Sequence, residues 1–125
     1  MRIYLGLGSN LGDRRSNLFQ ALKLLKERAL IITRVSPVVE SPALLLADSP
    51  ADWDRPFLNL ALQCETKDRP ETVYGWIKEI EQNLGRVSGP CWAPRPIDID
   101  ILIWGDNEID TKTLTIPHIE LQKRN

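Results

Sequence analysis

Two aspartates, Asp98 and Asp100, occupy alternate positions of an apolar segment in the last third of the chain. The residues that alternate with them are Ile97, Ile99, Ile101 and Ile103. Side chains of a β-strand point to its two faces in turn, so we expect the isoleucines on one face and both carboxylates on the other. Carboxylates two positions apart on a strand are roughly 7 Å apart, and both can lean toward a pair of metal ions.

A magnesium site is the chemistry that these paired carboxylates favour. Two adjacent anions repel each other, and Mg²⁺, which prefers oxygen ligands, would relieve that repulsion. A polar outer face of a half-buried strand is the alternative interpretation. The nearby Trp92 and Arg95 favour the metal site over this alternative.

Arginines flank the loop that precedes this strand. Arg86 and Arg95 lie at the two ends of a segment rich in proline and glycine, and Arg124 is a third candidate near the end of the chain. A guanidinium group binds phosphate oxygens through paired hydrogen bonds, although a single arginine is more often a solvated surface residue. Aspartates, metal ions and arginines together are what phosphoryl transfer requires, because its catalysis depends on positioning and charge neutralisation.

Other polar and aromatic residues carry weaker signals. His118 is the single histidine, which is either structural or a proton carrier near neutral pH. Trp92 is either a packing residue of a loop or a stacking platform for a flat ring. Asn59 interrupts an apolar strand, so it either recognises a ligand edge or satisfies backbone groups. Glycines at positions 6, 8 and 12 depart from the dinucleotide-binding spacing and predict a tight strand-to-helix turn.

Length and composition indicate one ordinary globular domain. The chain has 125 residues, 42% of them hydrophobic and 26% charged, with a net charge of −1. This charge creates no broad field to attract nucleic acid or anionic lipid, and no segment approaches the ~20 apolar residues of a membrane helix. Cys64 and Cys91 lack metal-ligand spacing, and free thiols fit a reducing, cytoplasmic location.

Hydrophobic periodicity predicts the elements that must position these residues. We expect strands over 2–8, 30–40, 57–64 and from 97 onward, and helices over 13–28 and from about 70 to 84. Asp13 suits a helix start, Asp68 and Glu71 a capping box, and Gly85 a helix end. Pro37 predicts an edge strand or a bulge.

The order of these elements, β-α-β-β-α-β, predicts an α+β fold of the ferredoxin-like type, an antiparallel sheet with both helices on one face. We expect the first and last strands to be neighbours and to form the central pair. The loops over 41–55 and 86–96 are longer than a plain domain needs, which is typical of functional lids.

Three segments resemble the signatures of the 6-hydroxymethyl-7,8-dihydropterin pyrophosphokinase family of folate biosynthesis. They are the stretches 6–14 (GLGSNLGDR), 92–102 (WAPRPIDIDIL) and 114–118 (LTIPH), and the resemblance covers essentially the whole chain. It implies transfer of pyrophosphate from ATP to the hydroxymethyl group of the dihydropterin, with release of AMP. It also implies two Mg²⁺ ions as cofactors.

The resemblance assigns roles residue by residue. Asp98 and Asp100 would hold the metal ions, and together with Arg86 and Arg95 they would be the catalytic residues. The residues implied for ATP are Glu81, Arg86, Arg95, Ile99, Thr115, His118 and Arg124. The residues implied for the pterin are Ser41, Pro42, Phe57, Asn59 and Trp92.

The chain also departs from the family's pattern. Ser88, Lys78 and Phe57 replace residues that are frequent in the family, and the chain stops at Asn125, where the family continues with a segment that sandwiches the pterin. We therefore expect a single domain over 1–125 without that extension, acting as a monomer on small molecules. The alternatives are a non-catalytic nucleotide-binding module with an incomplete pterin site, and a metal-dependent nucleotidyl transferase.

Overall fold

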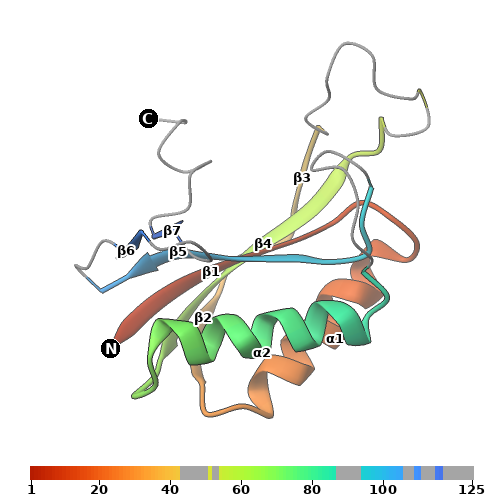
Figure 1. Ribbon diagram of the computed structural model, residues 1–125. Coiled ribbons are helices and arrows are strands. Elements are labelled where there is room, and N and C mark those ends of the chain that lie inside the picture. Colours follow the sequence, from red (N-terminus) through yellow and green to blue (C-terminus); the bar gives the residue numbers. More distant parts are fainter. Residues whose placement is uncertain (43–50, 52–53, 87–93, 106–108, 111–114, 117–125) are drawn as a thin grey trace.

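The computed structural model describes residues 1–42, 51, 54–86, 94–105, 109–110 and 115–116. Its elements, in chain order, are β1 (Arg2–Ser9), α1 (Arg14–Lys26), β2 (Ile31–Val35), β3 (Val39–Ser41), β4 (Phe57–Glu65), α2 (Pro70–Asn83), β5 (Asp98–Trp104), β6 (Ile109–Asp110) and β7 (Thr115–Ile116). Strands β1 to β5 form one antiparallel sheet, and α1 and α2 lie together on one of its faces (Figure 1). This arrangement confirms the ferredoxin-like α+β fold.

The strand order is β2-β4-β1-β5, with β3 also paired to β4. The prediction that the first and last strands are neighbours is confirmed, because β1 pairs with β5. The prediction that they form the central pair is wrong, because β1 and β4 are central and β5 ends the order. The long β1–β4 ladder, from Arg2↔Glu65 to Ser9↔Leu58, takes the second side of β1.

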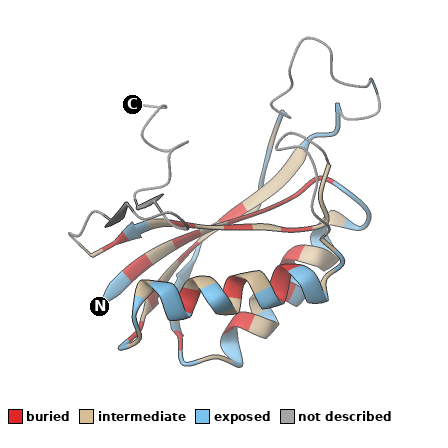
Figure 2. Ribbon diagram, viewed as in Figure 1, coloured by how far each residue is buried: buried red, intermediate tan, exposed pale blue. Residues whose placement is uncertain are grey.

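The hydrophobic core of the described residues lies between the helices and the sheet (Figure 2). Alternate residues of β1 and β4 point into it, as period-two patterning requires, and each helix contributes one apolar stripe. The fully or nearly fully buried residues include Ile3, Leu5, Leu7, Leu18, Leu25, Leu62, Val73, Ile77 and Ile80.

The helix ends show which local signals decide. Asp13 caps α1 by accepting a hydrogen bond from the Ser16 amide (3.1 Å), as predicted. The capping box predicted at α2 is wrong, because Arg69 is the N-cap residue and makes no side-chain cap bond. Pro70 at the first helical position sets this start instead, since its fixed φ suits a helix and it has no amide to satisfy. Gly85 follows the helix with φ +94°, as predicted.

A β-bulge changes the direction in which side chains point at the end of β5. The register with β1 shifts between Tyr4↔Ile103 and Leu5↔Ile101. One extra residue on β5 reverses the alternation of faces beyond it. Ile103 is therefore 38% exposed and Trp104 is 3% exposed. The prediction that Ile103 shares the buried isoleucine face is wrong for this reason, whereas Ile97, Ile99 and Ile101 are buried as predicted.

Pro37 divides the segment predicted as one strand into β2 and β3. At the break, the Ser36 hydroxyl accepts a hydrogen bond from the Ala61 amide of β4 (2.8 Å), and the Ser36 amide donates to the Ala61 carbonyl (2.9 Å). The side chain thus keeps β4 paired at the position where the chain bends. Both β2 and β3 lie at the edge of the described sheet, paired to β4, which confirms the edge position predicted from Pro37.

Cys64 gives a first testable prediction. The thiol is buried, and burial together with the charge of Glu65 raises its pKa to about 11. In a C91S variant, Cys64 is expected to react with a disulfide reagent at pH 8 only after unfolding, because the native thiol is both covered and protonated. The measurement is reagent uptake along a denaturant series, and rapid reaction in native buffer would contradict the placement of Cys64 in the core.

Candidate active site

The face of the sheet away from α1 and α2 carries a predicted pterin residue, Asn59, and a predicted metal residue, Asp98, in one row that crosses the strands. Gly8 of β1 pairs with Asn59 of β4 on one side and with Asp98 of β5 on the other. In the adjacent outward row, Gly6 pairs with Asp100. Neighbouring strands are about 4.8 Å apart, so the backbones of Asn59 and Asp98 are about 10 Å apart. The predicted pterin and metal residues therefore lie side by side, separated by a glycine.

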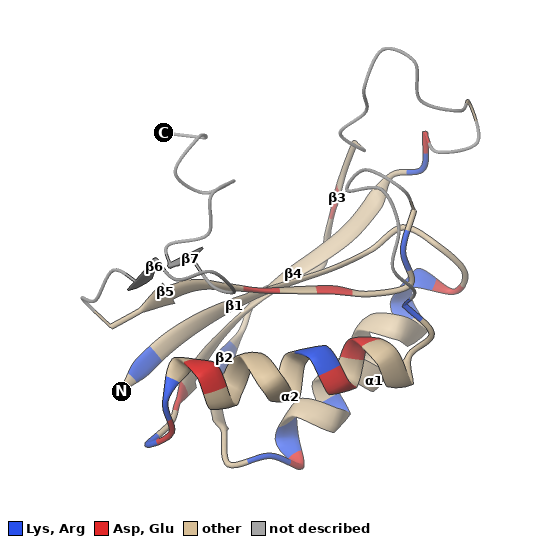
Figure 3. Cartoon of the chain, in the orientation of Figure 1, with Lys and Arg blue, Asp and Glu red and all other residues tan. Residues whose placement is uncertain are grey.

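Asp98 is the centre of the charged half of this row. Its Oδ1 lies 3.0 Å from Nη1 of Arg86 and 3.5 Å from Nη1 of Arg95. Burial and the neighbouring Asp100 carboxylate raise the pKa of Asp98 to about 6, against the opposing effect of the two arginines. The structure thus brings together Asp98, Arg86 and Arg95, and the acidic positions of β5 follow one another along the strand (Figure 3).

Glu81, at the end of α2, holds Arg86 in place. The Glu81 side chain is only 3% exposed, and it forms an ion pair with Arg86. Its Oε2 also accepts a hydrogen bond from the amide of Ile99 on β5 (2.9 Å), and its Oε1 one from Lys78 (3.2 Å). Burial alone would lower the pKa of Arg86, but the charges and hydrogen bonds of Glu81 and Asp98 raise it above its usual value. Arg86 is therefore a permanently charged group fixed beside Asp98.

This geometry refines the roles of Glu81 and Ile99, two residues that the resemblance assigned to ATP. The Glu81 carboxylate is buried and both of its oxygens are already bound, to Arg86, Lys78 and the Ile99 amide, which favours support of the site over direct contact with the nucleotide. The Ile99 side chain is buried in the core, and its amide is bound to Glu81. Any contact of Ile99 with ATP would have to come from the rest of its backbone.

Hydrogen bonds preorganise the part of the row that holds the residues predicted to bind the pterin. Asn59 Nδ2 donates to the Ser41 hydroxyl (2.7 Å) and, more weakly, to the Val39 carbonyl (3.4 Å). Ser41 in turn pairs with Phe57 across the β3–β4 ladder. The structure therefore brings Ser41, Phe57 and Asn59 together as predicted, and Pro42 follows directly in an exposed position.

Gly8 has no side chain and so leaves the surface between Asn59 and Asp98 open. A Cβ atom added there would lie 3.1 Å from Asn59 Oδ1 and 3.2 Å from Phe57 Cδ1, which is tighter than ordinary contact. Gly8→Ala is expected to displace these side chains and to raise the KM for the dihydropterin about tenfold. The Kd of a magnesium–ATP analogue, measured by calorimetry, should change less than twofold.

Gly75→Ala is the matched control for this prediction. A Cβ at Gly75, within α2, would have nothing within 4 Å. This substitution is expected to leave both constants unchanged and to stabilise the helix by up to about 1 kcal/mol. A KM change of similar size in the two variants would contradict the role assigned to Gly8.

Four predicted residues cannot be compared with the site in the same way. Trp92, His118 and Arg124 lie outside the described residues. Thr115 is described by its backbone, which pairs with Asp110 in the β6–β7 ladder. The roles of these four residues remain predictions.

One polar residue of the site region was missed by sequence reasoning. Asn10 follows β1, is 2% exposed, and makes hydrogen bonds to residues of both long connections, Arg55 and Arg95. Asparagine is common in turns, so its place after a strand does not indicate that this one is buried. Only the tertiary contact with Arg95 distinguishes it.

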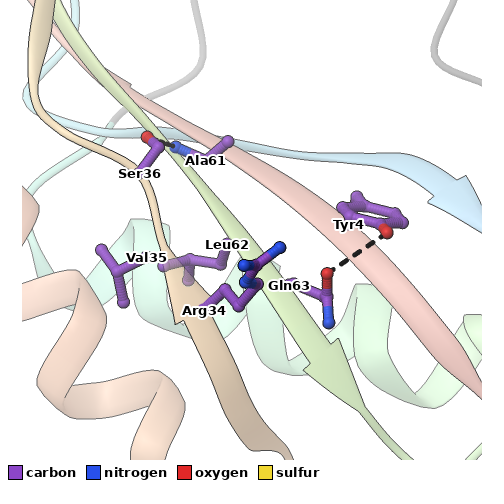
Figure 4. Close-up of a pocket in the computed structure, with 7 residues that line it drawn as sticks. All are labelled: Tyr4, Arg34, Val35, Ser36, Ala61, Leu62 and Gln63. Carbon is purple, nitrogen blue, oxygen red and sulfur yellow. Dashed lines mark hydrogen bonds between the residues drawn. The ribbon is translucent and has the colours of Figure 1, made fainter.

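A hollow lies farther along the same outward face of the sheet. Its volume is about 420 Å³, and its lining includes Tyr4, Arg34 and Gln63 (Figure 4). The Tyr4 hydroxyl donates to Gln63 Oε1 (3.3 Å). The Gly8 row does not contribute to this lining, so the hollow is separate from the charged cluster.

The donor set fits a hard cation that is held only in part by protein. Among the described residues, no three acidic, histidine or cysteine side chains converge on a point that could hold a metal ion. Mg²⁺ is commonly held by one or two carboxylates, with phosphate and water oxygens completing its shell. Asp98 and Asp100 supply such a pair, and a cation would relieve the repulsion from Asp100 that, after burial, helps to raise the pKa of Asp98.

Within the described part of the chain, neither helix has the length and apolar character needed to cross a membrane.

Comparison with known proteins gives consistent matches. Residues 4–125 match a family model described as 7,8-dihydro-6-hydroxymethylpterin-pyrophosphokinase. The 2-amino-4-hydroxy-6-hydroxymethyldihydropteridine pyrophosphokinase of Aquifex aeolicus is 42% identical over 98% of this chain and 72% of its own length. The protein of the same name from Bacillus subtilis is 35% identical, over 97% and 70%.

Relatives of a second kind are larger. The folate synthesis bifunctional protein of Chlamydia caviae is 42% identical over 98% of this chain, which spans only 28% of that protein. The bifunctional protein of Pisum sativum, described as mitochondrial, is 37% identical, and the chain spans 23% of it.

Proposed function

The chain belongs to the 7,8-dihydro-6-hydroxymethylpterin-pyrophosphokinase family, and from this membership we propose that it transfers pyrophosphate from ATP to 6-hydroxymethyl-7,8-dihydropterin in folate biosynthesis. One observation carries the proposal. A cluster of carboxylates and arginines on β5 stands one glycine away from the Asn59–Ser41 pair, on the same face of the sheet.

The reaction exchanges one bond to phosphorus for another. The hydroxymethyl oxygen of the pterin attacks the β-phosphorus of ATP and loses its proton. The bond from that phosphorus to the α,β-bridging oxygen breaks, and AMP leaves with the electron pair. The barrier to such a transfer is lowered mainly by holding the two reactants in line and by stabilising charge on the phosphate oxygens.

The described residues divide these tasks. Arg86, fixed by Glu81, and Arg95 present guanidinium groups beside Asp98, where they would bind phosphate oxygens. Asp98 and Asp100 would hold Mg²⁺, in our proposal two ions, which neutralises the charge of the triphosphate when bound. Asn59, held by Ser41, would present its Oδ1 to an edge of the pterin, and Phe57 would contact the ring.

The remaining features of the proposal follow from the sequence. Small molecules are the expected ligands, since a net charge of −1 offers no general attraction for nucleic acid. Cys64 and Cys91, which lack metal-ligand spacing, support a reducing, cytoplasmic location. We expect the protein to act as a monomer.

The direct test is AMP formation from ATP, magnesium and hydroxymethyl-dihydropterin, with the pyrophosphorylated pterin identified as the second product. AMP release that requires all three components supports the proposal. Release of pyrophosphate instead would favour nucleotidyl transfer. Binding of a non-hydrolysable ATP analogue with Mg²⁺, but not of the pterin, would favour the non-catalytic module.

A further inference from the structure

Asn10 binds the backbone of Arg95 at two points. Its own amide donates to the Arg95 carbonyl (3.1 Å), and its Oδ1 accepts from the Arg95 amide (2.8 Å). This closed pair of hydrogen bonds fixes both peptide groups that flank the Arg95 Cα. The Arg95 side chain then leaves the backbone toward Asp98, three residues along the chain. A buried amide is therefore connected to the catalytic cluster through one arginine.

The amide nitrogen of the Asn10 side chain binds the other long connection, the one that leads into β4. Its Nδ2 donates to the Arg55 carbonyl (3.1 Å), two residues before Phe57. Arg14, in the first turn of α1, binds the next peptide by donating to the Pro56 carbonyl (2.9 Å), and it pairs with Glu40 next to Ser41. Asn10 in the turn after β1 and Arg14 at the start of α1 thus contact the residues immediately before Phe57 and Ser41.

The environment of Asn10 makes these contacts difficult to replace. Asn10 is 2% exposed, so water has little access to its amide group. Both of its side-chain polar atoms have partners, as a buried amide requires. Its oxygen and nitrogen face opposite kinds of partner, an amide hydrogen and a carbonyl. Only a side chain with an acceptor and a donor in this arrangement satisfies both.

We propose that Asn10 is a positioning residue, which fixes Arg95 over Asp98 and joins that arginine to the Arg55–Phe57 segment of the acceptor site. This inference rests on the proposed pyrophosphoryl transfer. It predicts that loss of Asn10 lowers the rate of reaction chiefly through Arg95. A residue that only stabilised the fold would not depend on Arg95 in this way.

A double-mutant cycle tests the proposal, using AMP formation by wild type, N10A, R95A and N10A/R95A. N10A is expected to lower kcat about tenfold in the wild-type background and less than twofold in the R95A background. N10D keeps an acceptor for the Arg95 amide and loses the donor to Arg55. It should therefore retain most of kcat and raise the KM for the pterin.

Asn17 provides the matched control. It lies at the start of α1, and its Nδ2 donates back to the turn at the Leu11 carbonyl (3.0 Å). N17A is expected to show no coupling to R95A. Equal losses from N10A in both backgrounds, or coupling of the same size from N17A, would overturn the proposal.

Amide hydrogen exchange of the ligand-free protein separates this proposal from the proposed function. The Arg95 amide is expected to exchange at least about tenfold faster in N10A than in wild type, and at nearly the wild-type rate in N10D and N17A. If wild type forms no AMP, the proposed function fails, and the exchange rates still decide the positioning role. Unchanged protection of Arg95 in N10A overturns it.

Discussion

Replacing Asp98 with asparagine is expected to reduce AMP formation by at least about a thousandfold without weakening the fold. The substitution keeps the size of the side chain but removes a charge that faces Asp100, Arg86 and Arg95. Asparagine is a poor ligand for Mg²⁺ in comparison with a carboxylate, so both charge neutralisation and orientation of the phosphates would suffer. The measurement is kcat at saturating ATP and magnesium.

The stability of the same variant should change in the opposite direction. Burial and Asp100 raise the pKa of Asp98 to about 6 in the fold, above the ordinary value of 3.8. The native state therefore binds this proton more tightly than the unfolded state, so this group lowers stability as the pH rises from about 4 to about 6, and the loss is complete above that pH. In magnesium-free buffer at pH 7.5, D98N should unfold at the same or a higher temperature than wild type. The difference should disappear below about pH 4.

Glu79 offers the control for these measurements. Its carboxylate is exposed on α2 and pairs with Arg28 at 2.8 Å. E79A removes one carboxylate from the surface and is expected to keep nearly all activity. Retained turnover in D98N, or an equal loss in E79A, would contradict the metal assignment.

Replacing Glu81 with alanine is expected to lower the free energy of unfolding by about 2–4 kcal/mol and to slow turnover as well. The substitution leaves the Ile99 amide of β5 without its acceptor and Arg86 without its principal partner. A buried donor that loses its partner retains the full cost of its desolvation, which explains the size of the effect. Urea denaturation measures the first quantity, and kcat/KM for ATP measures the second.

Glu81→Gln separates the two effects. Glutamine keeps an oxygen that can accept from the Ile99 amide, but it carries no charge to hold Arg86. The variant is expected to recover most of the lost stability while its kcat/KM remains low. If E81A unfolds at the same urea concentration as E79A, or if E81Q restores full activity, the anchoring role of Glu81 is wrong.

The sequence predicts most of this fold because local pattern and global topology agree. Alternating apolar residues, two helical stripes, Asp13, Pro37 and Gly85 each indicate the element that the structure contains. The exceptions have definite physical causes. Ile103 faces outward because a bulge in β5 adds one residue to the count, and no periodicity within a single strand reveals a register shift against its neighbour.

The candidate site divides in the same way. Asp98, Arg86 and Arg95 are close in sequence, so a strand and its preceding loop sufficed to group them. Glu81 and Asn10 act across long separations, on β5 and on Arg95 respectively. Their importance depends on burial and on partners that only the folded chain brings near. The resemblance named Glu81 only as a residue for ATP, and no pattern in the sequence assigned a role to Asn10.

The row that joins Asn59, Gly8 and Asp98 has a consequence for substrate choice. The spacing of strands in a sheet is set by backbone hydrogen bonds and hardly varies. The distance between the backbones of Asn59 and Asp98, about 10 Å, is therefore nearly constant. An acceptor whose heterocycle is held at Asn59 must carry its alcohol on an arm of matching length. Analogues with a hydroxyethyl arm should therefore bind yet react slowly, because the oxygen would overshoot the phosphorus. Selectivity of this kind would come from main-chain geometry and not from any side chain.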